Sequence, residues 1–315
     1  MGSLLAVIAT GLHIALCLAG APLLWGGIEA LCARMRGERG ASPLQPYRRL
    51  IRLLGRTALL PDTATDMFAL WPMLACLALA VAVMLIPGFC TGLLTARAAD
   101  YVTIIGLFAL GRAGVMLGGL ETGAAFGGMG AARLAWLGLG MEAALLVLLL
   151  VFAKLAGRTD LNAMAVAFGD GRVGFTGATG LALAAMLVIA VIATSDRPAT
   201  GRELTMACNA VALEYSGRQL AWLEYADMLR LLAWMNLVIC IFIPFGMGRA
   251  QAVLSWPLGL ALWWLKLFCL AVGMAVFTVI RAEIRWRRAP PAWGLALVLG
   301  VLASMLLVIV AGAGA

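Results

Sequence analysis

The chain has 315 residues, of which 64% are hydrophobic and only 12% are charged. Soluble domains average about 45–50% apolar and about 25% charged residues, so this composition excludes a soluble protein and predicts a polytopic membrane protein. No polar stretch is long enough to enclose a second core, so we expect one membrane domain over residues 1–315. The seven cysteines form no C-x-x-C pair, and we expect the only histidine, His13, to pack inside the helical core rather than bind a metal.

Windows of about twenty apolar residues predict an all-α integral membrane protein with about eight transmembrane helices. The first and the seventh of these windows are long enough to tilt in the bilayer or extend beyond it. The predicted spans cover residues 4–31, 68–93, 99–120, 131–153, 175–195, 229–248, 254–280 and 291–313.

The distribution of basic residues predicts the orientation of these spans. The connections after spans 1, 3, 5 and 7 carry sixteen Lys and Arg residues, counting Arg133 and Arg230 at their edges, against five after spans 2, 4 and 6. Basic connections face the cytoplasm, so both termini are expected on the outer, periplasmic side of the inner membrane. The net charge of +8 is explained by this asymmetry and gives no argument for nucleic-acid binding.

The first connection contains the stretch LQPYRRLIRLLGR, which predicts a short amphipathic helix in the membrane interface. Four arginines fall on one helical face and four apolar or aromatic residues on the other. Anchoring to anionic lipid and binding of a partner protein are equally compatible with this pattern. The two faces consist of Arg48, Arg49, Arg52 and Arg56, and of Tyr47, Leu50, Ile51 and Leu54.

Ionisable residues lie inside three predicted spans: Arg112, Glu142 and Lys266, with Glu29 and Glu121 near span ends. A carboxylate near the bilayer centre costs on the order of 3 kcal/mol, so such residues face the bundle interior and mark ion routes by default. The alternative is a structural ion pair, for example Glu142 with Lys266. The pattern alone leaves both interpretations open.

The two long connections over residues 34–65 and 196–228 are expected to be docking loops on the cytoplasmic face. The first includes ERGASPLQPYRRLIRLLGRTALLPD, which resembles the first loop of the membrane subunit shared by respiratory complex I and membrane-bound [NiFe] hydrogenases. That family pattern is an R-G-P turn, then Q-x-Y-R-D, then K-L and a proline. The residues that fit it are Arg39, Gly40, Gln45, Tyr47, Arg48, Leu53 and Pro61, with Arg52 in place of the lysine.

Three further stretches are similar to the same family. They are GLETGAAFGGMGAARLAWLGLGMEA, which ends just after Glu142, LEYSG at 213–217, and the arginine-rich VIRAEIRWRRAPPAW. The segment Glu121-Thr122-Gly123 favours the formate hydrogenlyase and hydrogenase-4 branch over the complex I branch. The resemblance therefore covers nearly the whole chain.

The resemblance implies a subunit that anchors a cytoplasmic electron-transfer arm and starts a proton route toward antiporter-like membrane subunits. Iron–sulfur clusters and a Ni-Fe or flavin centre would belong to hydrophilic iron–sulfur and hydrogenase-like partner subunits, with no cofactor in this chain. In complex I the junction adjoins the quinone chamber, so a quinone at this position is also allowed.

The resemblance assigns no catalytic, cofactor-binding or metal-binding residue to this chain. The residues it implies for the proton path are Glu142, Glu121, Lys266, Glu29, Glu203 and Glu214. Those it implies for arm docking and the junction are Arg39, Gln45, Tyr47, Arg48, Arg52, Arg133, Tyr215, Arg281 and Arg285.

The loop over residues 196–228 departs from the family pattern. The family normally has P-F-D-L-x-E-A-E-x-E-L before E-Y-S-G, whereas this chain retains only Glu203 and Glu214 of the acidic cluster. Two alternatives therefore remain beside the main prediction: a purely structural anchor, and a quinone-chamber subunit of a proton-pumping NADH:quinone oxidoreductase. A stand-alone transporter is disfavoured because the sequence shows no inverted repeat.

Overall fold

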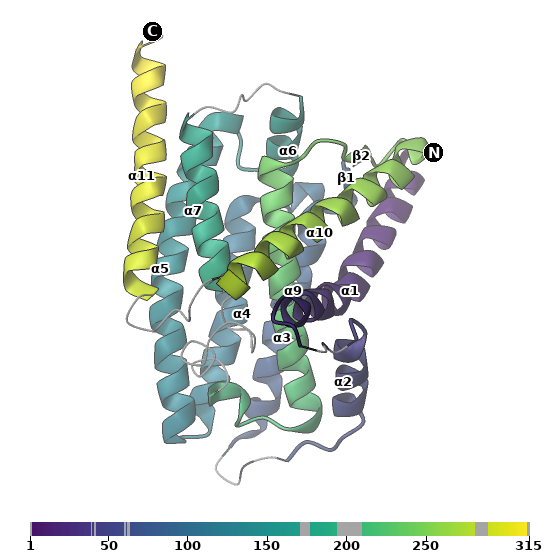
Figure 1. The fold of residues 1–315 in the computed structure, drawn as a ribbon, viewed down its shortest axis with the longest axis vertical. Helices are drawn as coiled ribbons and strands as arrows, with labels where there is room; N and C mark the ends of the chain where they lie inside the picture. The colour runs from purple at the N-terminus through teal and green to yellow at the C-terminus, as the bar shows by residue number, and fades with distance from the viewer. Residues whose placement is uncertain are drawn as a thin grey trace.

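The computed structural model describes residues 2–38, 40, 42–59, 61, 64–170, 177–193, 210–280 and 289–313. Helices dominate these ranges, and two strands of two residues each accompany them (Figure 1). The helices are α1 (Gly2–Met35), α2 (Gln45–Leu54), α3 (Leu70–Leu85), α4 (Tyr101–Glu121), α5 (Ala125–Ala156), α6 (Leu161–Gly169), α7 (Gly177–Ala193), α9 (Gly217–Phe242), α10 (Trp256–Ile280) and α11 (Ala289–Ala313).

Within the described residues, six helices are long and apolar enough to span a membrane. Two shorter apolar helices, Gly177–Ala190 and Gly294–Ile309, lie within two further predicted spans. The predicted all-α integral membrane fold is therefore confirmed, while the number of eight spans stays a prediction. The six long segments are Leu4–Met35, Met67–Leu85, Tyr101–Glu121, Ala125–Ala156, Gly217–Phe242 and Val253–Ile280.

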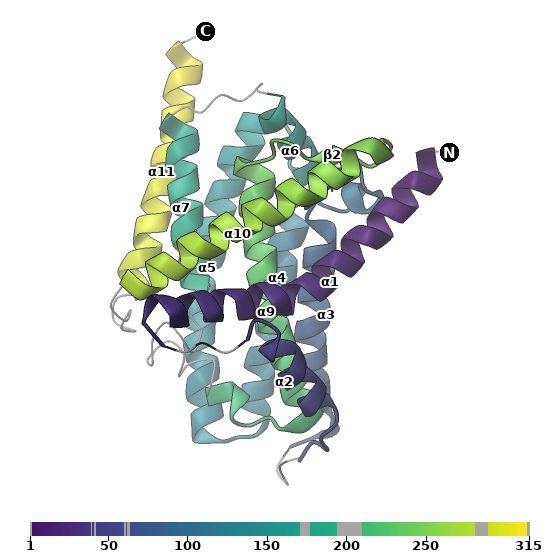
Figure 2. The same cartoon turned by 45° about the vertical axis from the view of Figure 1, so that its right-hand side comes forward.

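The bundle has two ends that differ in their connections. At one end, the segment between α1 and α3 carries α2, and residues 210–216 precede α9; we call this the loop end. At the other end, β1 (Cys90–Thr91) pairs in parallel with β2 (Gly248–Arg249); we call this the strand end. Figure 1 shows β1 and β2 near the top and α2 toward the bottom. The long helix α1 contains Pro22 and changes direction part-way along (Figure 2).

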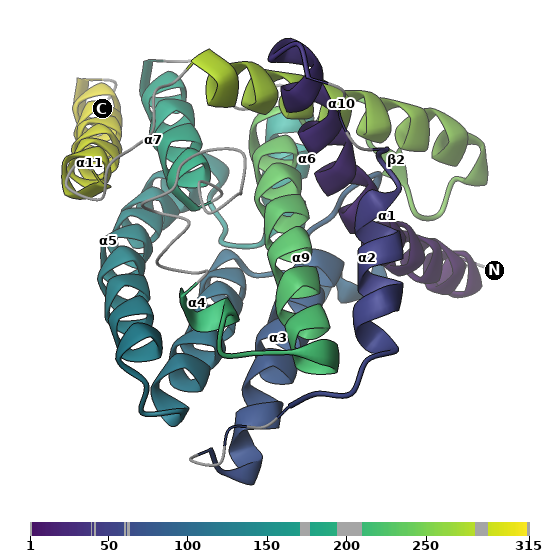
Figure 3. The ribbon, with the colours of Figure 1, turned by 60° about the horizontal axis from the view of Figure 1, so that its bottom comes forward.

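Helix α9 forms the centre of the bundle (Figure 3). It contacts α1, α2, α3, α4, α6, α7 and α10, and every residue from Leu231 to Phe242 is buried. Apolar residues occupy all sides of this stretch, as expected for a helix that is surrounded on every side. Phe108 of α4 stacks on Trp234 of α9 with ring centroids 5.0 Å apart.

A closed hydrogen-bonded network ties α1, α9 and α10 together toward the strand end. The Nε1 atom of Trp263 donates to Oδ1 of Asn236 over 3.0 Å, and Nδ2 of Asn236 contacts Sγ of Cys17 over 3.9 Å. The thiol of Cys17 lies 3.7 Å from the ring of His13, whose Nε2 is 3.0 Å from the carbonyl oxygen of Ile86. His13 is fully buried, so it packs inside the core as expected.

Several predicted boundaries need correction. Helix α3 ends at Leu85 rather than at 93, and α5 begins at Ala125 rather than at 131. The largest correction is at α9. This helix begins at Gly217, so the end of the predicted docking loop 196–228 is helical, and the helix ends at Phe242 rather than at 248. Charged residues such as Glu224 and Asp227 lower the apolar content of its first turns, which hides this part of the helix from a hydropathy window. The nine-residue helix α6 was missed because it is too short to register as a span.

Candidate functional site

A mid-helix ion pair joins α4 and α5. Nη1 of Arg112 lies 3.3 Å from Oε1 of Glu142, and the side chains are 10% and 35% exposed, respectively. Gly138, one turn before Glu142, leaves the space that the arginine occupies, because a Cβ at this position would collide with its guanidinium. The ion-pair partner of Glu142 is thus Arg112, and the suggested Glu142–Lys266 pair is wrong.

Lys266 of α10 has a different role in the structure. Its ammonium donates to the carbonyl oxygen of Ile243 over 2.7 Å and to that of Phe245. These carbonyls follow the last turn of α9, where a cation complements the negative end of the helix dipole. The sequence shows Lys266 only as an isolated lysine within a predicted span. In the structure α10 packs beside the end of α9, and the carbonyls there are the hydrogen-bond partners of the lysine.

Two carboxylates on the first turns of α9 were not among the predicted site residues. Glu224 accepts a hydrogen bond from Nη2 of Arg49 on α2 over 2.5 Å, and Asp227 lies 3.0 Å from Nη2 of Arg230. Their spacing of three residues places them on one helical face. This spacing is visible in the sequence, but the charged residues lower the hydropathy of the stretch, which therefore resembles a loop.

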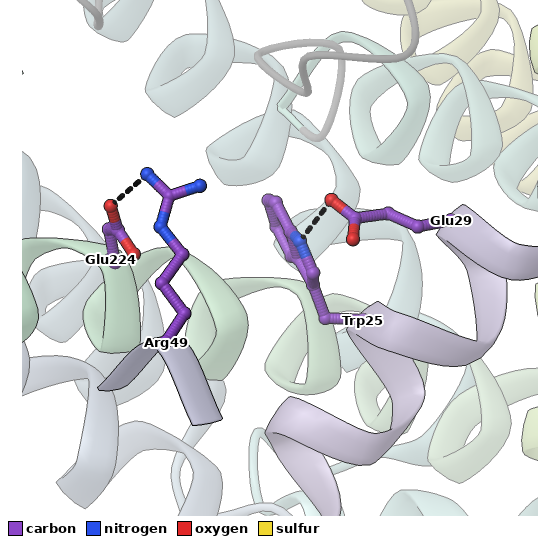
Figure 4. A network of polar contacts seen from close by, with 4 residues as sticks. All are labelled: Trp25, Glu29, Arg49 and Glu224. Atoms are coloured by element: carbon purple, nitrogen blue, oxygen red, sulfur yellow. Dashed lines mark hydrogen bonds and ion pairs between the residues drawn. The ribbon is translucent and has the colours of Figure 1, made fainter. Parts of the chain in front are cut away.

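A chamber with about 340 Å³ of space opens at the loop end between α1, α2 and α9. Its polar wall includes Glu29, Gln45, Arg49, Glu224 and Asp227. Figure 4 shows Glu29 accepting a hydrogen bond from the Trp25 indole over 2.8 Å, beside the Arg49–Glu224 pair. Its apolar wall consists of Trp25, Pro46, Ala212, Leu213, Leu220, Leu223 and Met228.

A smaller inner cavity, with about 40 Å³ of space for water-sized molecules, lies deeper in the bundle. It shares Leu223 and Asp227 with the loop-end chamber, and Arg112 lines its wall. Asp227 therefore stands between the two spaces. The acidic and basic groups form one series from the chamber, through Asp227, to the Arg112–Glu142 pair.

The two predicted docking loops meet in the structure. The backbone N–H of Leu59 donates to Oγ of Ser216 over 2.8 Å. Gly217 has a φ of +53°, and a Cβ there would stand 2.5 Å from the carbonyl oxygen of Thr57. The residues just before α9 and those after α2 thus pack as one surface.

Two predicted tyrosines anchor this surface. The Tyr47 hydroxyl donates to the carbonyl oxygen of Ala19 on α1, and Tyr215 stacks on Phe68 with centroids 4.2 Å apart and planes 8° from parallel. Burial raises the pKa of Tyr215, and the nearby carboxylates of Glu121 and Glu214 raise it further. Tyr215 is therefore a neutral side chain that packs on Phe68, and Tyr47 ties α2 to α1 through its hydroxyl.

Other predicted residues are spread over the loop end. Glu121, at the end of α4, accepts hydrogen bonds from Oγ1 of Thr65 and from the Trp71 indole, the latter over 3.1 Å. Gln45 lines the chamber, Arg48 and Arg52 are exposed on the outer face of α2, and Arg133 and Glu214 are half-buried. Arg39, Glu203, Arg281 and Arg285 lie outside the described residues.

No group of three His, Cys, Asp or Glu side chains able to hold a metal ion occurs within the described ranges. This part of the chain does contain acid–base groups, namely carboxylates paired with basic side chains. Carboxylates can gain and lose protons, whereas a guanidinium stays charged and acts as a fixed positive partner.

The helical bundle defines a multi-pass membrane protein with a partly buried series of ionisable groups. The sequence matches the family profile described as NADH dehydrogenase over residues 9–310, and the chain belongs to this family. The predicted resemblance is thereby confirmed.

Two relatives from Escherichia coli (strain K12) are hydrogenase-type subunits. Hydrogenase-4 component C is 33% identical over 235 residues, which is 73% of this chain and 72% of the relative. Formate hydrogenlyase subunit 4 is 29% identical over 266 residues, or 84% of this chain and 87% of the relative.

The fold is also similar to a chain in the solved structure of the membrane-bound sulfane sulfur reductase, an archaeal respiratory membrane complex. The TM-score is 0.80 at 17% identity, and the match covers 96% of this chain and 99% of that chain. At this identity the likeness supports the fold alone.

Proposed function

We propose that this chain is the membrane-anchor and proton-path subunit of an energy-converting complex of the formate hydrogenlyase or [NiFe] hydrogenase type. It docks a cytoplasmic electron-transfer arm and couples electron transfer to proton translocation. The observation that carries the proposal is the series of ionisable groups from the loop-end chamber to the Arg112–Glu142 pair. The hydrogenase-type relatives support the class of complex.

The proton route begins in the loop-end chamber, where Glu29 and Glu224 collect protons, and continues through Asp227 at the wall shared with the inner cavity. It then reaches Glu142. Arg112 takes no part in proton transfer itself, because a guanidinium does not lose its proton in a protein. Its fixed positive charge lies 3.3 Å from the carboxylate of Glu142 and positions that side chain.

The arm docks on the paired loops at the loop end. The joined residues around Leu59 and Ser216 form the rigid part of this surface, and the exposed Arg48 and Arg52 give it a positive charge. The partners there are hydrophilic iron–sulfur and hydrogenase-like subunits, and antiporter-like subunits contact the chain within the inner membrane. Both termini then lie on the periplasmic side.

The hydrogenase-type relatives do not favour the alternative of a quinone-chamber subunit in a proton-pumping NADH:quinone oxidoreductase. A purely structural anchor makes a different prediction about Glu142. In that case the carboxylate serves only as the partner of Arg112, and its neutral isostere would weaken assembly before it affected coupling.

The test has two stages. The first is purification of the intact complex in mild detergent and mass spectrometry of the co-purifying chains. A [NiFe]-type large subunit, iron–sulfur proteins and antiporter-like chains support the proposed class, whereas a chain that purifies alone contradicts it.

The second stage compares wild type with Glu142→Gln in inverted membrane vesicles supplied with formate. Hydrogen evolution and proton uptake, followed by quenching of a ΔpH-sensitive dye, are measured in the same vesicles. We expect the variant to assemble and evolve hydrogen while proton uptake per hydrogen falls at least about tenfold, as expected when a required proton carrier is removed. Normal proton uptake in this variant would exclude Glu142 from the path.

A further inference from the structure

Trp234, which lines the inner cavity, has an indole N–H that no described protein group satisfies. Trp234 of α9 lines the cavity and is 1% exposed. Its ring is stacked on Phe108 with planes 1° from parallel, which fixes its orientation. The Nε1 atom is buried and has no hydrogen-bond partner among the described residues.

Several other indoles in the described chain have acceptors. Nε1 of Trp25 donates to Glu29, that of Trp71 to Glu121, and that of Trp263 to Asn236. A buried N–H without a partner is costly, so such groups are normally satisfied by the protein or by an ordered water. Trp234 therefore indicates that the cavity beside it holds water.

The cavity has the volume and the polar wall that water needs. A buried water requires about 10–15 Å³ of accessible space and two to four polar partners. The cavity offers about 40 Å³, with donors from the guanidinium groups of Arg112 and Arg230 and acceptors from the carboxylate of Asp227. A water here can accept from Trp234 and donate to Asp227.

We propose that the inner cavity holds ordered water positioned by the Trp234 indole, and that this water bridges Asp227 and the Arg112–Glu142 pair. The part of the proposal that concerns proton transfer rests on the proposed function. In each transfer Asp227 gives up one proton to the water, the water passes on one of its own protons, and Glu142 gains one. Trp234 is a positioning residue, because it holds the water and does not carry the proton.

The first test is a high-resolution map of the purified wild-type complex. We expect ordered water within hydrogen-bond distance of Nε1 of Trp234 and of the Asp227 carboxylate. A dry cavity would overturn the proposal. This outcome depends only on the map, so it is judged separately from whether the complex translocates protons.

The second test replaces Trp234 by Phe, which keeps an aromatic ring on Phe108 but removes the N–H. Because no described acceptor loses a partner, W234F should assemble as well as wild type. Proton uptake per hydrogen should fall roughly three- to tenfold, the factor that corresponds to loss of one hydrogen bond to the water. Unchanged coupling in W234F, with water present in the wild-type map, would exclude the positioning role.

A matched control removes a different buried indole N–H. Trp263→Phe deletes the donor to Asn236 in the network toward the strand end, away from the cavity lining. W263F should lower the thermal stability of the complex and leave proton uptake per hydrogen unchanged, the reverse of the W234F pattern. If W234F fails to assemble, the variant Trp234→His is used instead, because it restores a ring N–H at this wall. Retained coupling in W234H supports the proposal, and lost coupling opposes it.

Absence of proton uptake in the wild-type complex would refute the proposed function and leave the water site to be decided by the map. The two failures are therefore distinguishable.

Discussion

The two halves of α9 bury polar groups in opposite ways. Toward the strand end, Asn236 belongs to a closed network in which side chains and a backbone carbonyl satisfy one another. Toward the loop end, Asp227 and Arg230 form an ion pair beside a cavity that Arg112 also lines. A closed network of neutral groups has no space and no exchangeable charge, so it serves structure. The open, charged series has both, as the proposed proton path requires.

The largest expected effect comes from removing Arg112. Arg112→Met leaves Glu142 without its partner, and because that carboxylate is 35% exposed we expect a loss toward the lower end of about 3–5 kcal/mol. Thermal unfolding of the purified complex measures the loss. The double variant R112M/E142Q should recover most of the stability and none of the proton uptake. Stability that stays low in the double variant would contradict a simple ion-pair role.

Gly138 provides a test of the space around this pair. Gly138→Ala places a methyl group against the Arg112 guanidinium, and the displacement should cost about 1–3 kcal/mol and reduce proton uptake. Gly128→Ala on the same helix is the matched control, because a Cβ there meets nothing within 4 Å. It should stay within about 1 kcal/mol of wild type, on the stabilising side. If the two variants had equal effects, the space beside Gly138 would not be what positions Arg112.

The closed network should respond in stability only. Asn236→Leu removes the acceptor of the Trp263 indole and should cost about 1–3 kcal/mol, with no change in proton uptake per hydrogen. Removing both partners in N236L/W263F should cost less than the sum of the single changes, because neither group is then left unpaired. A loss of coupling in N236L would place this network in the proton route and erase the contrast between the two halves.

The smallest expected effect concerns the Arg49–Glu224 pair in the chamber wall. The arginine side chain is 59% exposed, so Arg49→Gln should cost no more than about 1 kcal/mol. The effect should shrink further at high salt, since exposed charges are screened. Arg52→Gln is the control, because it also removes one positive charge from α2 but at a position that does not contact Glu224. A larger effect of R52Q on stability would show that net charge matters more than the Arg49–Glu224 contact.

Hydropathy and charge predicted the all-α membrane fold, and the motifs around Tyr47 and Glu142 predicted the family. The ion-pair partner of Glu142 was not predictable, because it depends on the side-by-side packing of α4 and α5 and on the gap at Gly138. Glu224 and Asp227 were missed for a local reason. Their charges interrupt the apolar run, so a window that detects spans treats the first turns of α9 as a loop.

The contacts of Lys266 have a consequence for how the two ends of the molecule can communicate. Its ammonium donates hydrogen bonds to the carbonyls that follow α9. The neighbouring turns of α9 are hydrogen-bonded through the His13–Asn236–Trp263 network. Movement of α9 along its axis, like a piston, would break all of these bonds at once. These bonds oppose a displacement of this helix. They favour the proposed proton path, in which charge states change along side chains that stay in place.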